Sequence, residues 1–371
     1  MARRVASSAQ FGAAYSQAVA GTDAGALVAL LDTTPDDAFR REIAGHDVAA
    51  LASQLQFHKV PAAHKKRFAS LAEAYLAYVA GPAAPYDTWS VVFTRATAIF
   101  ALDVPWFSPA LKFIGKTLVD LAAQSDAQHN HGKTVDAAGR LSKCAALSAN
   151  DRTAATMAET KRSSALALAN LSFRAYLRLR NTRLCETVLG SVNNALQMNI
   201  RFDGQGDGYT GEEGYPMSER VMFHYYIGRI RLAYGRITVA AENLRWAFDR
   251  CPPSSRHNRR VIAIPLVSAY LILGRYPTQK LLTECGLVDQ FSALTHHLRL
   301  GNGAGVMSEL QRHMHWLRIH GLYGHLQEKL ILGVWRNIFR RCLALQLTTA
   351  TNAPPTLRLS TIRVAGSHDH G

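Results

Sequence analysis

Apolar residues recur at steps of three and four along most of this chain, which is the spacing of helices with one buried face. Examples are Phe68, Leu71, Tyr75, Leu76 and Val79, and further on Val92, Phe93, Ala96, Ile99 and Phe100. Almost no segment alternates apolar and polar residues as a half-buried strand would. The pattern therefore predicts an all-α protein.

The periodicity divides the 371 residues into four segments. We expect an N-terminal helical region over 1–121, a flexible loop over 122–160, a helical repeat domain over 161–347 and a tail over 348–371. The loop is predicted because residues 122–153 are small and polar with little helical period. Within the repeat domain a Gly-rich, acidic connection is expected at 203–216, followed by helices at about 218–234, 238–250, 258–273, 278–285, 289–298, 306–320 and 322–347.

A ladder of small and apolar residues marks one helical hairpin in this domain. It consists of Gly228, Ala240, Leu244, Ala247 and Pro252, at successive spacings of 12, 4, 3 and 5. Small residues of this kind allow two antiparallel helices to approach closely, and a proline ends the second helix. A TPR-like hairpin cannot bury its apolar face alone, so it stacks on neighbouring hairpins. The ladder therefore favours a binding or scaffold protein.

The positive charge of the chain is concentrated in the predicted repeat domain. The net charge is +15, from 42 Lys and Arg against 27 Asp and Glu. Residues 1–160 contribute +1, residues 161–347 contribute +13 and the tail contributes +1. A surface of this sign favours polyanions or acidic protein segments as partners.

Three groups of arginines are candidates for binding nucleic acid or an acidic partner, because a guanidinium group donates two hydrogen bonds in a fixed fork. They are Arg256, Arg259 and Arg260; Arg336, Arg340 and Arg341; and Arg174 and Arg178. The alternative is an ordinary solvated face. We expect charge reversal of the first group to weaken polyanion binding without unfolding the domain. Trp246 and Trp335 could stack on bases, but their helical spacing is more typical of a core.

Catalytic and metal-binding motifs are absent from the sequence. It contains no phosphate-binding loop, nucleophile elbow or dinucleotide fingerprint, so we expect no enzyme and no cofactor. The five cysteines form no C-x-x-C pair, and the pairs His129/His131, His296/His297 and His313/His315 have no acidic or Cys ligands nearby, so no metal site is expected. The 203–216 connection has Gly214 where a calcium loop needs Glu.

Three blocks within 161–347 resemble the PCI-domain proteins of the Thp/PCID type. The first is KRSSALALANLSFRAYLRLRNTRLCE, in which Asn170, Phe173, Tyr176, Leu177, Leu184 and Cys185 fall as the family has them. The second block, HYYIGRIRLAYGRITVAAENLRWAFDRCP, is followed by NRRVIAIPLVSAYLILGRYPTQKLL. The third is EKLILGVWRNIFRR, with Arg336-Asn337-x-Phe339. Order and spacing agree over about half of the chain.

The resemblance implies a right-handed TPR/HEAT-like repeat arm that ends in a winged helix and acts as a non-catalytic scaffold. Family members include the PCI subunit of the transcription-coupled mRNA export complex. It implies a larger PCI scaffold protein and a small acidic Sem/DSS-type peptide as partners, with RNA or DNA bound through the assembled complex. It also implies location in the nucleus, including the nuclear pore, with some protein in the cytoplasm. A subunit of the signalosome or proteasome lid, and a stand-alone TPR-like peptide adaptor, are the alternatives.

The chain departs from the family after the third block. The family continues through a recognition helix and a wing, whereas the 24 residues after Leu347 do not resemble that module. We therefore expect the C-terminal winged helix to be incomplete or divergent, with 348–371 as its remnant.

Overall fold

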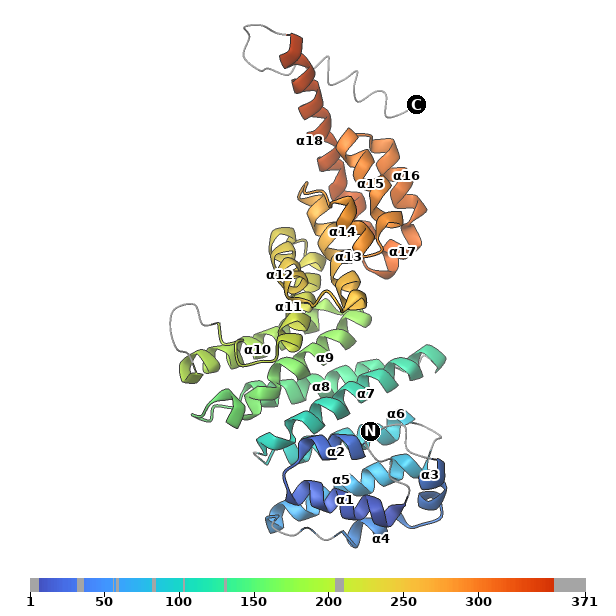
Figure 1. Ribbon diagram of the computed structural model, residues 1–371, viewed down its shortest axis with the longest axis vertical. Coiled ribbons are helices and arrows are strands. Elements are labelled where there is room, and N and C mark those ends of the chain that lie inside the picture. The colour runs from blue at the N-terminus through green and yellow to red at the C-terminus, as the bar shows by residue number, and fades with distance from the viewer. Residues whose placement is uncertain are drawn as a thin grey trace. The chain divides into compact units, whose positions relative to one another are not determined.

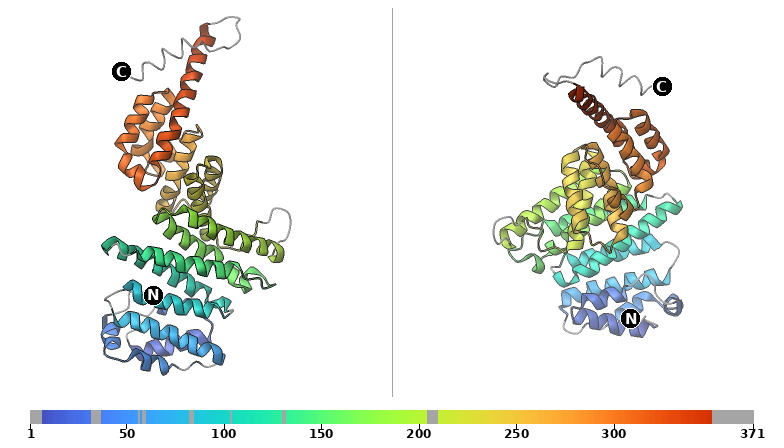
Figure 2. Two further views of the ribbon diagram at one scale, coloured as in Figure 1. Left: turned by 180° about the vertical axis from the view of Figure 1, so that it is seen from behind. Right: turned by 45° about the horizontal axis from the view of Figure 1, so that its top comes forward.

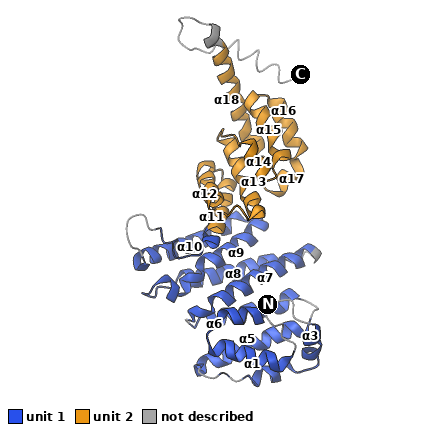
Figure 3. Cartoon of the chain, in the orientation of Figure 1, with its two compact units in different colours: residues 1–220 blue, residues 221–371 orange. Residues whose placement is uncertain are grey.

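A computed structural model shows a chain built from helices (Figure 1). It describes residues 7–31, 37–55, 57, 60–81, 85–102, 104–129, 132–203 and 210–349. In these ranges there are 18 α-helices, three short 3₁₀ helices and no strand, which confirms the all-α prediction. The helices form two compact units, residues 1–220 and residues 221–371 (Figure 3).

Unit 1 contains ten complete helices. They are α1 (Ser8–Ala20), α2 (Ala24–Leu30), α3 (Asp37–Ala44), α4 (Val48–Ser53), α5 (Ala62–Ala80), α6 (Pro85–Phe100), α7 (Ser108–His129), α8 (Lys133–Ala149), α9 (Ala165–Arg178) and α10 (Thr182–Asp203), with 3₁₀ helices at Pro105–Phe107, Met157–Glu159 and Lys161–Ser164. Aromatic side chains fill the core between α1 and α7. The polar ends of these rings are satisfied: the Trp89 indole donates to the Ile114 carbonyl at 3.0 Å, and the Tyr15 hydroxyl donates to the Phe68 carbonyl at 2.9 Å.

The remaining helices belong to unit 2, apart from the first residues of α11. They are α11 (Met217–Ala233), α12 (Ile237–Arg250), α13 (Arg256–Ile272), α14 (Gln279–Glu284), α15 (Val288–Leu300), α16 (Gly303–Arg312), α17 (Met314–Ile319) and α18 (Tyr323–Thr349). The helix expected at 306–320 is interrupted at His313, where the backbone leaves helical geometry and α17 begins. The other helices expected after residue 217 are present with small shifts of their ends.

The flexible loop expected over 122–160 is wrong, because α7 continues to His129 and α8 occupies most of the remainder. The buried face of α8 consists largely of small residues: Thr134, Ala137, Ala138, Leu141, Cys144, Ala145, Ser148 and Ala149. These residues do have a helical period. Their small side chains allow close packing of α8 against α9, but they give a weak hydrophobic signal in the sequence.

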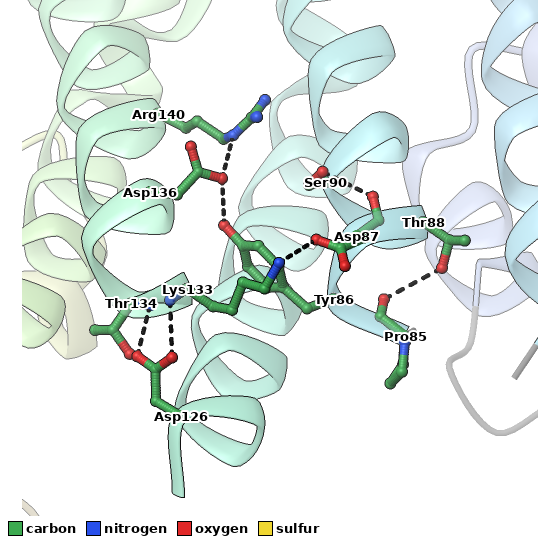
Figure 4. A network of polar contacts seen from close by, with 10 residues as sticks. All are labelled: Pro85, Tyr86, Asp87, Thr88, Ser90, Asp126, Lys133, Thr134, Asp136 and Arg140. Carbon is green, nitrogen blue, oxygen red and sulfur yellow. Dashed lines mark hydrogen bonds and ion pairs between the residues drawn. The ribbon is translucent and has the colours of Figure 1, made fainter. Parts of the chain in front are cut away.

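A polar network fixes the turn from α7 into α8 (Figure 4). The Asp126 carboxylate on α7 accepts hydrogen bonds from the backbone N–H groups of Lys133 (2.7 Å) and Thr134 (2.8 Å), which satisfies donors that the first turn of α8 leaves free. Above this turn, Asp136 accepts from the Tyr86 hydroxyl of α6 at 2.6 Å and from Arg140 at 2.8 Å. The network therefore joins α6, α7 and α8.

The segment after α8 is held by one buried arginine, Arg162. Its guanidinium group donates to the carbonyl oxygens of Asp151 (3.0 Å), Thr153 (2.9 Å) and Ala155 (2.7 Å). Its Nε donates to Asn199 Oδ1 of α10 at 3.0 Å. A charge that is buried without a paired carboxylate needs such hydrogen bonds, and these bonds define the path of residues 150–161.

In unit 2 the hairpin of α11 and α12 is closely packed. A β-carbon at residue 228 would lie 2.5 Å from Leu244 Cγ and 3.2 Å from the Ala240 carbonyl, so only glycine fits without a shift of α12. Ala240, Leu244 and Ala247 are fully buried. Pro252 follows the end of α12 by two residues, where its ring prevents further helix.

Two further sequence predictions concern the C-terminal tail and the boundaries between segments. The remnant winged helix predicted at 348–371 lies almost wholly outside the described residues, and α18 ends at Thr349. The division into compact units falls at 220/221 and not at 160/161. A functional domain spanning 161–347 stays a prediction.

Candidate partner-binding surface

Two of the three candidate arginines on α13 bind the ends of other helices. Arg259 Nη1 donates to the carbonyls of Cys251 (3.0 Å) and Phe248 (3.4 Å). Arg260 Nη1 donates to the carbonyls of Cys285 (3.0 Å) and Gly286. The last carbonyls of a helix have no partner within that helix, so these arginines cap α12 and α14. The side chain of Arg256 is exposed and makes no hydrogen bond or ion pair with any described residue.

Of the three candidate arginines on α18, two contact the backbone elsewhere in unit 2 and one does not. Arg341 Nη1 donates to the carbonyl of Leu300, the last residue of α15, at 2.9 Å. Arg336 lies against the backbone at Gly274, where a β-carbon would collide with its guanidinium group. Arg340 is exposed and has no partner among the described residues. The three side chains therefore do not converge on one ligand.

Asn337, which lies between these arginines, is buried and also serves the fold. Its Nδ2 donates to the carbonyl of Leu298 at 2.6 Å and to the Tyr276 hydroxyl at 2.5 Å. Together with Arg341 it satisfies the C-terminal end of α15. The Arg-Asn pair of the third sequence block is thus a helix-packing element in this structure.

The two candidates in unit 1 contact α7. Arg174 Nη2 forms an ion pair with Asp120 at 2.7 Å, and Arg178 Nη2 donates to the Ala123 carbonyl at 3.3 Å. Both side chains are largely exposed, so each interaction is worth about 1 kcal/mol or less. They join α9 to α7 and leave part of each guanidinium group accessible.

Unit 2 retains a large positive charge despite these contacts, because an arginine bonded to a carbonyl keeps its charge. Residues 221–349 contain 17 Lys and Arg against 6 Asp and Glu, a net charge of +11. Ion pairs already engage most of the acidic residues: Asp249 with Arg245, Glu284 with Lys280, Asp289 and Glu309 with Arg312, and Glu328 with Lys329. The excess positive charge in the described part of unit 2 is therefore available to attract anions.

The two tryptophans near the arginines have different surroundings. The Trp246 ring is stacked on His224 with centroids 3.9 Å apart, and the Arg250 guanidinium carbon lies 4.2 Å from its centre. Two planar groups this close cannot share one side of a ring, so both faces of Trp246 are covered and no base can stack there. Trp335 is 39% exposed, so the core interpretation is wrong for this residue.

Exposed apolar residues on α18 were not anticipated from the sequence. Ile331, Leu332, Phe339 and Leu345 are exposed together with Trp335, while Leu330, Val334 and Cys342 on the opposite side are buried in the core of unit 2. A helix that is apolar on both faces is usually buried all round. The apolar residues on both faces of α18 are therefore the sequence feature that could have predicted this surface.

A groove of about 600 Å³ between α1, α4 and α5 is lined by uncharged side chains such as Phe11, Gln17, Leu51 and Leu55.

The five cysteines are buried, and burial raises the pKa of Cys144 to about 12, so its thiol stays protonated at neutral pH. No group of three or more His, Cys, Asp or Glu gathers as a metal site in the described ranges, and none of the helices there is long and apolar enough to cross a bilayer.

These contacts change the expected result of reversing Arg256, Arg259 and Arg260 together. Reversal at Arg259 and Arg260 would leave helix-end carbonyls without donors and place carboxylates beside them. The expectation that the domain stays folded is therefore unsound for the triple variant. Arg256 alone, or Arg256 with Arg340, is the suitable probe of polyanion binding.

The sequence is similar to several curated proteins, although no protein-family model matches it. It is 27% identical over 256 residues to a PCI domain-containing protein 2 homolog of Dictyostelium discoideum, an alignment covering 67% of this chain and 56% of the relative. It is 30% identical over 250 residues to PCI domain-containing protein 2 of Xenopus laevis, covering 66% of this chain and 58% of the relative. It is 26% identical over 304 residues to a PCI domain-containing protein of Schizosaccharomyces pombe, covering 76% and 66%. The chain thus spans 56–66% of the length of these relatives.

Proposed function

Because this chain belongs to the PCI-domain proteins of the Thp/PCID type, we propose that it is a non-catalytic scaffold subunit of a nuclear complex that couples transcription to mRNA export. In this role it binds a larger PCI protein and a small acidic Sem/DSS-type peptide, and it contributes to RNA or DNA binding. It acts in the nucleus, including the nuclear pore.

The observation that carries the nucleic-acid part of the proposal is the charge of unit 2. The net charge of +11 over residues 221–349 lies on a folded helical surface whose acidic residues are mostly paired. Such a surface favours sequence-independent binding of phosphates. Arg256 and Arg340 have no partner among the described residues, so their guanidinium forks can bind phosphate without breaking an interaction of the fold.

The scaffold part of the proposal is supported by the kind of surface that the helices form. Packed helical hairpins present extended faces to partners. The groove between α1, α4 and α5 has no ionisable side chain in its lining, so nothing there is arranged for general acid or base chemistry. Extended faces of this kind are suited to holding other molecules.

Affinity purification of the tagged full chain from its native cells, followed by mass spectrometry, tests which complex it joins. Recovery of a larger PCI scaffold of the export machinery together with pore proteins is the expected result. Stoichiometric recovery of signalosome or proteasome-lid subunits in their place would overturn the nuclear export role.

A further inference from the structure

The outer face of α18 carries an exposed apolar surface that adjoins Arg340. Leu332 is 72% exposed, Trp335 39% and Phe339 37%, and Ile331 is exposed beside them. Figure 2 shows α15 and α16 in orange beside the first part of α18 in red, whose later turns extend past them. Each of these four side chains has more than a third of its surface exposed.

The apolar residues of this face form one continuous stripe. Residues 332, 335 and 339 are spaced by three and four, which places their side chains next to one another along a helix. The rings of Trp335 and Phe339 are in contact, with centroids 5.9 Å apart. Single exposed apolar residues are common on proteins, but a contiguous aliphatic and aromatic stripe on one helix marks an interaction site.

Basic side chains lie along one margin of the stripe. Lys329, Arg336 and Arg340 are spaced by seven and four residues, so they share a face of the helix adjacent to the apolar one. The nearby acidic residue Glu328 is already paired with Lys329 at 3.3 Å. Because the Lys329–Glu328 pair has no net charge, the positive charge of the margin comes from Arg336 and Arg340, and the Arg340 side chain has no partner among the described residues.

The width of the apolar stripe and the charge of its margin favour one kind of binding partner. A second copy of the chain would bring two units of the same net charge, +11 over residues 221–349, against each other, which is unfavourable. The exposed stripe is one helix wide, because the other side of α18 packs on α13, α15 and α16, and this width fits a single partner helix. A helix with an apolar face and an acidic margin matches both the width and the charge.

We propose that the stripe formed by Leu332, Trp335 and Phe339, with its basic margin, docks an amphipathic helix of a partner protein that carries Asp or Glu along one edge. This inference deepens the scaffold function proposed above by naming one of its surfaces. The partner helix packs its apolar residues against the Trp335 and Phe339 rings, and its carboxylates lie beside Arg340.

The test uses the full chain and three labelled synthetic peptides in fluorescence anisotropy. The first peptide is a helix with Leu on one face and Glu along one edge, the second has Lys in place of each Glu, and the third has the residues of the first in scrambled order. The acidic peptide is expected to bind, and Trp335→Ser or Phe339→Ser is expected to weaken its binding by roughly tenfold or more. Arg340→Glu is expected to weaken the acidic peptide and to strengthen the Lys peptide.

Controls distinguish a loss of peptide binding at this surface from unfolding of the chain and from failure of the proposed nuclear role. Val135→Ser removes a similarly exposed apolar side chain from α8 and is expected to leave peptide binding unchanged. Circular dichroism checks that each variant is folded. Equal binding of all three peptides, binding unaffected by the α18 variants, dimerisation that disappears in Trp335→Ser, or equal capture by anionic vesicles would each overturn the proposal. None of these outcomes alters the co-purification result that tests the nuclear complex.

Discussion

The guanidinium carbon of Arg259 lies 4.1 Å from the centre of the Phe248 ring, across the junction between α12 and α13. The same arginine donates to the Cys251 carbonyl at the end of α12. Arg259 therefore stabilises the fold, whereas its neighbour Arg256 at the start of α13 is available to bind ligands. This division of roles among adjacent arginines can be measured.

Arg259→Glu is expected to destabilise unit 2, whereas Arg256→Glu is expected to change stability little. The first variant removes two hydrogen bonds and a cation–π interaction and places a carboxylate beside carbonyl oxygens, which should lower the free energy of unfolding by about 2–3 kcal/mol. The second alters an exposed residue and should stay within about 0.5 kcal/mol. Urea denaturation followed by circular dichroism measures both, and equal effects of the two substitutions would contradict this assignment.

Polyanion binding by the isolated chain is expected to depend on Arg256 and Arg340. Replacing both with Glu should weaken binding of a labelled single-stranded RNA and reduce the slope of log affinity against log salt by roughly 1 for each phosphate that the variant no longer binds. Anisotropy titrations at several salt concentrations measure this slope. Arg95→Glu on α6, an exposed arginine of unit 1, is the matched charge control. An identical slope in the double variant and wild type removes these two residues from the nucleic-acid surface.

Gly228→Ala is expected to destabilise the α11–α12 hairpin. The added methyl group would lie 2.5 Å from Leu244 Cγ, so α12 must shift, at a cost of about 1–3 kcal/mol. Gly190 on α10 provides the contrast, because a β-carbon there meets nothing within 4 Å. Gly190→Ala should stabilise its helix by about 0.5–1 kcal/mol through helix propensity. Thermal unfolding of the two variants should therefore shift in opposite directions, and a neutral Gly228→Ala would refute the close helix approach.

Arg162→Met is expected to release the segment between α8 and α9. Its removal leaves the carbonyl oxygens of Asp151 and Ala155 and the side-chain oxygen of Asn199 without donors, and the free energy of unfolding should fall by about 3–5 kcal/mol because several polar groups become unsatisfied together. Hydrogen–deuterium exchange should report faster exchange in residues 151–161, with less effect on α5 and α6. Protection unchanged across 151–161 would show that other interactions hold this segment.

The cap formed by Asp126 predicts a dependence of stability on pH. Burial alone would raise the pKa of Asp126, but hydrogen bonds from Thr134 and Lys133 and the charge of Arg178 lower it overall. The unfolded value is about 3.9, so the carboxylate stabilises the fold above this pH and the contribution is lost as pH falls through the folded pKa. Asp126→Asn should therefore lower the free energy of unfolding by about 1 kcal/mol at pH 7, with a difference that shrinks at pH 3. Denaturation curves at both pH values provide the measurement, and a difference as large at pH 3 as at pH 7 would argue against a charged cap.

The helical nature of the chain could be predicted because large apolar residues repeat at steps of three and four. The same signal failed at α8, where the buried face uses small residues such as Ala137, Cys144 and Ala145. The start of α8 also depends on Asp126, which lies on the preceding helix and is seven residues from Lys133. An interaction between two helices of this kind leaves no periodic pattern in the sequence.

The candidate arginines could be identified from the sequence, but their partners could not. Arg260 and Arg341 bind carbonyls that are 25 and 41 residues away along the chain, at helix ends whose positions depend on the packed fold. Spacing alone also places Arg341 with Arg340 on one basic face, whereas Arg341 points to the end of α15. The exposure of Trp335 escaped prediction because α18 is apolar on both its buried and its outer side.

The central claim is that this chain holds its protein partners directly, with nucleic acid bound in addition. The most direct measurement is quantitative co-purification of wild type and the Arg256→Glu variant, each with and without nuclease. The account predicts that PCI partners are retained in all four samples, while co-purified RNA falls in the variant. Disappearance of the protein partners after nuclease treatment of wild type would contradict the scaffold role, because the chain would then be tethered only through nucleic acid.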